Sequence, residues 1–151
     1  MNKIQNLAQL DEFYQQLKTL SLMQSALAIV VESEMIVKKQ LLPTLKKIGF
    51  KEVQVLDEGK ELLELIVKFD GPLLLWFELR PGAVFLDPLL KIIKAMRPKK
   101  PLCAIFCGRA DDKLSLAKVL NQKEPNVMVR PLDSKTIEKK LRDYILNSNF
   151  S

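Results

Sequence analysis

The chain has 151 residues, of which 48% are apolar and 28% charged, and its formal net charge is +6. These proportions are typical of one soluble globular domain. Histidine is absent from the sequence, which excludes His-based acid–base catalysis and most zinc sites. No apolar run approaches the roughly 20 residues of a membrane helix, and the N-terminal segment is polar. We therefore expect a cytoplasmic protein without membrane contact.

Basic residues gather in the later part of the chain. Residues 91–151 hold 14 Lys and Arg against 6 Asp and Glu, or +8, whereas residues 1–90 hold 10 against 12, or −2. Such asymmetry favours an acidic partner, either a protein or a nucleic acid, although solvated helix faces alone also produce it.

The two cysteines, Cys103 and Cys107, fall in one predicted strand. Four residues of strand separate them by about 13 Å, which is too far for a disulfide. In a chain without histidine, two thiols are more often core residues than metal ligands. The sequence therefore predicts neither a disulfide nor a metal site at these positions.

Residues 1–24 show the apolar spacing of an amphipathic helix. Apolar side chains recur every three or four residues, at Ile4, Leu7, Leu10, Phe13, Tyr14, Leu17 and Leu20. A helix of this length is marginal alone and needs an apolar surface to pack on. It either packs on the rest of its own chain or pairs with a second copy, and three turns of stripe do not decide between these two.

After residue 26, short apolar runs alternate with amphipathic segments. Strands are predicted at residues 28–31, 52–56, 73–77, 102–106 and 127–129. Helices are predicted at residues 34–48, 60–69, 87–96, 111–121 and 134–146. Uninterrupted apolar runs are typical of strands that are buried on both faces. The alternation predicts a flavodoxin-like (βα)5 doubly wound parallel sheet with the strand order 2-1-3-4-5 and an extra N-terminal helix.

Five segments, taken in order, resemble the receiver domain of two-component response regulators. They are AIVVESE at residues 28–34, LKKIGF at 45–50, VLDEGKELLELI at 55–66, LLLWFELRPG at 73–82 and VRPL at 129–132. The resemblance covers about residues 28–146. It implies a receiver-like domain over residues 25–151, preceded by the amphipathic helix of residues 1–24, and a place in bacterial two-component signalling.

Receivers hold Mg²⁺ with an acidic pair after the first strand and with the aspartate, at the end of the third strand, that accepts the phosphoryl group. A hydroxyl residue after the fourth strand and a lysine after the fifth contact the phosphoryl oxygens. Matched by position, the acidic pair corresponds to Glu32 and Ser33, and the acceptor to Phe77, which Glu78 follows. The hydroxyl residue corresponds to Phe106 or, with a shift of one residue, to Cys107. The lysine corresponds to Arg130, and the next residue, Pro131, matches a proline of the family that is usually cis.

The resemblance implies a domain whose phosphoryl chemistry is lost, because a phenyl ring offers neither a nucleophile nor a metal ligand. We expect the rings of Phe77 and Phe106 to fill the former ion pocket. Glu78 takes the place of the missing acid only if the strand register slips by one, since consecutive strand residues point to opposite faces. Glu32 and Arg130 are expected to pair across the site, unless both point to solvent unpaired.

We therefore expect a non-catalytic signalling module that needs no cofactor or metal and binds another protein. In receivers the fourth helix, fifth strand and fifth helix of the repeating pattern commonly meet a partner or a second receiver. Here this region carries Lys113, Lys118, Lys123, Lys135, Lys139, Lys140 and Arg142. These charges fit an acidic protein partner.

Other functions stay open from the sequence. A homodimer can form through this basic region or through the N-terminal helix. A phosphorylatable receiver that uses Glu32 and Glu78 is one alternative. A basic module associated with nucleic acid is another, although the chain holds no recognisable DNA-binding motif.

Overall fold

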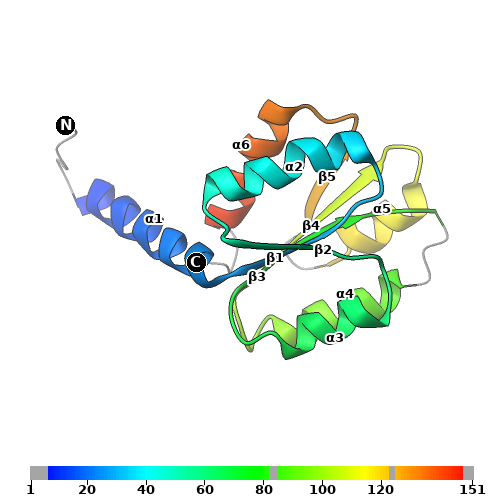
Figure 1. Ribbon diagram of the computed structural model, residues 1–151, viewed down its shortest axis with the longest axis horizontal. Helices are drawn as coiled ribbons and strands as arrows, with labels where there is room; N and C mark the ends of the chain where they lie inside the picture. The colour runs from blue at the N-terminus through cyan, green and yellow to red at the C-terminus, as the bar shows by residue number, and fades with distance from the viewer. Residues whose placement is uncertain (1–6, 82–84, 123–124, 148–151) are drawn as a thin grey trace.

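The computed structural model describes residues 7–81, 85–122 and 125–147, which form one five-stranded parallel sheet covered by helices (Figure 1). The strands stand in the order β2-β1-β3-β4-β5. Their bounds are β1 Leu27–Val31, β2 Glu52–Val55, β3 Leu73–Glu78, β4 Leu102–Arg109 and β5 Asn126–Arg130. The predicted flavodoxin-like architecture and strand order are therefore confirmed.

Helices cover both faces of the sheet (Figure 1). One face carries α2 (Met35–Ile48) and α6 (Ser134–Asn147), and the other carries α3 (Lys60–Lys68), α4 (Leu86–Met96) and α5 (Lys113–Leu120). The predicted helices agree with these bounds to within two residues, whereas β3 and β4 extend one and three residues beyond the predicted strand ends. Among the described residues, no helix combines the length and the apolarity needed to cross a membrane.

The strand sequences explain the buried sheet. Every residue of β1 and β3 is buried, as expected for strands without polar interruption that have helices on both sides. Alternate residues supply two cores. Ala28, Val30 and Trp76 pack beneath α2 and α6, while Leu75 and Phe77 pack against α3 and α4.

Phe77 and Phe106 meet on the α3–α5 side of the sheet. Their ring centroids lie 6.1 Å apart at an interplanar angle of 64°, an edge-to-face arrangement, and the residues are 0% and 3% exposed. They are adjacent because β3 and β4 pair Phe77 with Phe106. The expectation that these rings fill an ion pocket at the strand ends is wrong, because both belong to the interior core.

The first helix, α1 (Leu7–Ser25), extends away from the body, and only its C-terminal end reaches the other helices (Figure 1). There Met23 is buried, and Leu20 and Met23 lie against Gly49. Gly49 ends α2 at a φ of 136°, a conformation that glycine adopts without strain. Residues 7–24 of the predicted N-terminal helix are thus helical, and residues 1–6 lie outside the described residues.

Substituting Phe77→Asp should destabilise the fold, because it removes a fully buried ring and places a carboxylate in the apolar core. We expect a loss of at least about 4 kcal/mol in the free energy of unfolding, measured by urea denaturation. The matched control is Val67→Asp on α3, where the side chain is half exposed and the loss should stay below about 1 kcal/mol. A well-folded Phe77→Asp protein would contradict the assignment of this ring to the core.

Candidate functional site

The carboxyl ends of the strands bring charged side chains together at one edge of the sheet. The residues just after β1 and at the ends of β3 and β5 contribute Glu32, Glu78 and Arg130. Glu78 and Arg130 border an open cleft of about 680 Å³, which is also lined by Ser33, Glu34, Leu79, Arg80, Pro81, Arg109, Asp111 and Asp112. Glu32 is buried behind it. This edge is where ligands bind in sheets of this topology, so it is the candidate site.

Glu78, and not Phe77, presents its side chain at this edge. β3 continues to Glu78, which pairs with Cys107, and Val31 pairs with Phe77, so Glu78 lies beside Glu32. Alternation along the strand turns Phe77 to the opposite face. Phe77, which the sequence matched to the acceptor position, therefore lies in the core, and Glu78 is the carboxylate of β3 that borders the edge beside Ser33.

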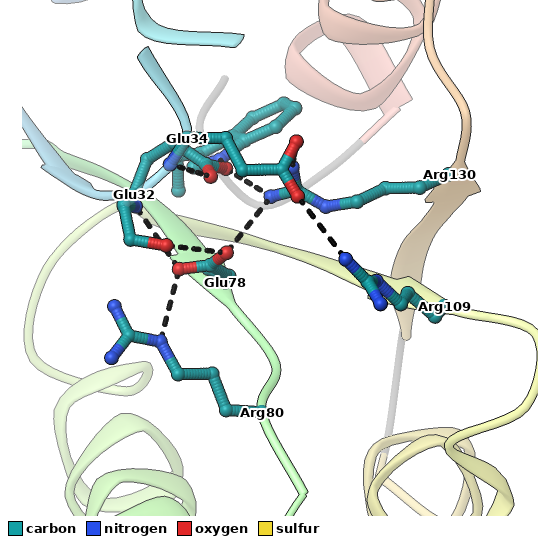
Figure 2. A network of polar contacts seen from close by, with 8 residues as sticks. Glu32, Glu34, Glu78, Arg80, Arg109 and Arg130 are labelled. Carbon is teal, nitrogen blue, oxygen red and sulfur yellow. Dashed lines mark hydrogen bonds and ion pairs between the residues drawn. The ribbon is translucent and has the colours of Figure 1, made fainter. Parts of the chain in front are cut away.

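The carboxylate of Glu78 accepts three hydrogen bonds and forms an ion pair with Arg130 (Figure 2). The backbone N–H and the hydroxyl of Ser33 each donate to it at 3.0 Å. Arg80 Nε donates at 3.1 Å, and Arg130 Nη2 lies 3.6 Å from Oε2. Each oxygen of Glu78 thus already has a protein partner.

Glu32 and Arg130 form the ion pair that the sequence predicted. Their side chains are 0% and 9% exposed, so neither points into solvent unpaired. Trp76 Nε1 and the backbone N–H of Glu34 also donate to the Glu32 carboxylate, each at 3.0 Å. Burial of a charge is costly unless it is paired and hydrogen-bonded, and this arrangement meets both conditions.

Arg130 connects this pair to the rest of the cluster (Figure 2). Its Nη1 lies 2.9 Å from Glu34 Oε2, as an ion pair that is not aligned as a hydrogen bond. Arg109 approaches the other oxygen of Glu34 at 3.7 Å. Three carboxylates, of Glu32, Glu34 and Glu78, therefore share their charge with three guanidinium groups, and Arg130 touches all three acids. We call these six residues the ion-pair cluster.

The residues of this cluster do not fit the magnesium ion of a receiver site. Mg²⁺ needs several carboxylate or water oxygens in octahedral geometry, but both oxygens of Glu32 and of Glu78 already accept from protein donors. Arg130 places a cation among the acids. Within residues 7–81, 85–122 and 125–147, no three carboxylates or thiols gather closely enough to hold a metal ion.

The surroundings shift the pKa values of the buried groups in different directions. Burial raises the pKa of Glu32 in spite of its hydrogen bonds from Trp76, Glu34 and Arg130. Burial also acts to raise the pKa of Glu78, but the donors of Ser33 and Arg80 outweigh it and hold that pKa below its ordinary value. Arg130 keeps its charge, since nearby anionic groups raise its pKa against the effect of burial.

The remaining predicted site residues divide between the two faces of the sheet. Phe106 points to the α3–α5 core, whereas Cys107 lies in the core on the α2–α6 side, beside Arg130. Burial raises the pKa of the Cys107 thiol to about 12, so it supplies no thiolate nucleophile near neutral pH. Neither Cys103 nor Cys107 forms a disulfide, and both are buried. The peptide bond between Arg130 and Pro131 is cis, as the resemblance implied.

Sequence reasoning missed four members of the site: Trp76, Glu34, Arg80 and Arg109. Strand alternation offered a signal for Trp76, which is two residues before Glu78 and so faces the same side. The strand assignments also implied that β1, β3 and β4 end at one edge, close to Glu34, Arg80 and Arg109. Which charges pair there depends on side-chain conformations that the sequence does not fix.

Replacing Glu78 by Gln tests its contribution to the cluster. At neutral pH we expect Glu78→Gln to lower the free energy of unfolding by about 1–3 kcal/mol, because Arg80 and Arg130 lose an anionic partner. The pKa of Glu78 in the folded protein lies below its ordinary value of 4.5. The stabilisation of the fold by this charge is therefore fully present above pH 4.5. This contribution is lost as the pH falls through the lower folded-state value.

The difference in free energy of unfolding between the wild-type protein and Glu78→Gln should therefore become smaller between neutral pH and about pH 3, as measured by urea denaturation. Glu52→Gln, at an exposed position of β2, is the control and should change stability little at any pH. A difference that stays constant down to pH 3 would contradict the stabilising role of the Glu78 charge.

Two solved structures are similar to the chain in fold. One is the structure of a protein described as the pilus assembly protein CpaE2 of Sinorhizobium meliloti 1021. It is 20% identical to this chain, with a TM-score of 0.54, and the match covers 78% of this chain and 97% of the other chain. The other is a two-component transcriptional regulator AraC of Clostridium phytofermentans ISDg, with 17% identity, a TM-score of 0.57, and coverage of 80% and 95%. No family model matches the chain, and no curated protein sequence does. At these identities the likeness concerns architecture, and the chain has the fold of a receiver domain.

Proposed function

We propose that this chain is a receiver-like signalling module that acts by binding a protein and does not transfer a phosphoryl group. The observation that carries the proposal is the position of Arg130, whose guanidinium touches the carboxylates of Glu32, Glu34 and Glu78. The receiver fold and the structural neighbour described as a two-component regulator support the signalling part.

Phosphoryl transfer to a carboxylate requires a free oxygen to attack and a cation to neutralise the developing charge. The acceptor aspartate of receivers is replaced by Glu78 at the end of β3, and its oxygens are engaged by Ser33, Arg80 and Arg130. Arg130 is a permanent charge and does not leave when a metal ion arrives. The site therefore favours one stable arrangement over a phosphorylation cycle.

The surface of α5, β5 and α6, which we call the basic face, supports docking to an acidic protein. Its exposed cations are Lys113, Lys135, Lys139, Lys140 and Arg142. Lys118 forms an ion pair with Asp87 at 3.3 Å, and Lys123 lies outside the described residues. Exposed apolar side chains of Leu114, Leu120 and Val129 stand on the same elements. Cations interspersed with apolar groups suit a protein surface that is acidic and partly apolar.

A phosphorylatable receiver is the second candidate, and the placement of Glu78 favours it. The Glu78 carboxylate borders the cleft beside the Ser33 hydroxyl and Arg130, where a receiver has its acceptor. The two candidates differ in whether Mg²⁺ and a phosphoryl donor act on Glu78.

The wild-type protein, incubated with Mg²⁺ and acetyl phosphate, should show no added phosphoryl mass, because Glu78 lacks a free oxygen. Beryllofluoride with Mg²⁺ should leave the fluorescence of Trp76, the single tryptophan, unchanged, since no ion reaches its partner Glu32. The matched variant S33D/E78D/R130K removes the arginine and restores the receiver set of acids and lysine. It should bind Mg²⁺ and change the Trp76 fluorescence. A Mg²⁺-dependent adduct on Glu78 of the wild-type protein would favour the second candidate.

Charge reversal on the basic face should abolish partner binding. In affinity purification from the source cells, K135E/K139E/K140E should lose the proteins that the wild-type chain retains, because docking needs those cations. The control K39E/K46E/K91E makes the same change in net charge on α2 and α4, at exposed positions outside this face, and should retain them. Equal loss with both variants would indicate unspecific charge attraction. Loss on nuclease treatment would favour nucleic acid as the partner.

A further inference from the structure

A stripe of large apolar side chains along α1 is left uncovered in the single chain. Its members are 41% to 79% exposed: Leu7, Phe13, Tyr14, Leu17 and Leu20. So many large apolar side chains on one helix normally mark a contact surface. An isolated helix of 19 residues is also marginal in water, so α1 needs a surface that covers this stripe.

The body of the protein covers only the last turns of α1. A groove of about 410 Å³ lies where α1 meets α2 and α6, lined by Gln16, Leu20, Met23, Ile48, Arg142, Ile145 and Leu146. Before this groove the helix projects freely (Figure 1). The stripe therefore continues into an apolar groove at the base of its own helix.

We propose that two copies of this chain form a homodimer by antiparallel pairing of their α1 helices around a twofold axis near Gln15. The helix sequence is self-complementary in this register. Residues whose numbers sum to 30 face each other, so that Leu10 meets the partner's Leu20 and Phe13 meets the partner's Leu17. The spacing of 3, 4 and 3 residues between these positions is the heptad spacing of paired helices.

The charged side chains of α1 stay in water in this register. Asp11 and Lys18 are exposed, seven residues apart, and lie on the side of the helix away from Phe13 and Leu20. Pairing along the apolar positions therefore buries neither charge. An isologous interface of this kind closes after two copies.

The shape of the molecule is consistent with the same orientation. At 1.5 Å per residue, 19 residues span about 28 Å, so antiparallel helices hold the two bodies at opposite ends of the pair. The outer end of each α1 then lies over the partner's groove beside Met23. This interface lies apart from the ion-pair cluster and from Lys113, Lys135, Lys139 and Lys140 of the basic face, so the proposal goes beyond the proposed function.

The oligomeric state of the full chain tests the proposal directly. In sedimentation equilibrium the wild-type protein should be a dimer at about 50 μM, and F13E/L17E should be a monomer with a dissociation constant raised at least about 100-fold. The control is I36E/V67E, which changes two apolar residues on α2 and α3 that are at least as exposed as Phe13 and Leu17, and it should remain dimeric. Unchanged Trp76 fluorescence would show that the body of F13E/L17E keeps its fold and its ion-pair cluster.

A spin label at Gln24→Cys distinguishes the two orientations. The native Cys103 and Cys107 are buried, so the label attaches at position 24. Antiparallel pairing in this register separates the two labelled positions by about 27 Å along the axis, whereas parallel helices lie about 10 Å apart. A monomeric wild-type protein, a dimeric F13E/L17E or a short distance between the labels would each overturn the proposal.

Discussion

The contact of Arg130 with three carboxylates is the interaction on which the carboxyl edge of the sheet depends. A parallel sheet brings the ends of its strands together, and here this places Glu32, Glu34 and Glu78 within reach of one guanidinium. Buried carboxylates of like charge repel one another and lose hydration, so they stay ionised only beside a cation and hydrogen-bond donors. The planar guanidinium, with its several N–H donors, can contact several acids at once, which a lysine ammonium does with less directional specificity.

An internal arginine gives the site a different character from a metal centre. A metal ion binds and leaves with its concentration, and a phosphoryl group is added and removed, so such a site has at least two states. A side chain belongs to the chain permanently. Signalling by population shift requires a ligand or modification with different affinity for two conformations. In the proposed function, the surface and not the cluster selects the partner, because the cluster is closed by its own residues.

The architecture could be predicted from the sequence because it follows from apolar runs and their periodicity. The Glu32–Arg130 pair was also predictable, since both follow strands whose ends meet at one edge. The prediction failed at Phe77 and Glu78 because one residue at a strand end decides which face a side chain takes. Apolar runs do not fix that end, since Glu78 is a buried polar residue in a strand otherwise made of apolar residues. The contacts of Arg80 and Arg109 depend on long side chains, for which local sequence holds no signal.

The short strand β2 has a consequence for how copies of the chain associate. An outer strand exposes unpaired backbone N–H and C=O groups, which can recruit the same strand of another molecule and lead to edge-to-edge aggregation. β2 has only four residues, begins with the charged Glu52 directly after Lys51, and is mostly exposed. Shortness and flanking charge make such an outer strand a poor template for sheet extension. The β2 edge of the sheet is thereby protected against open-ended polymerisation through strand pairing.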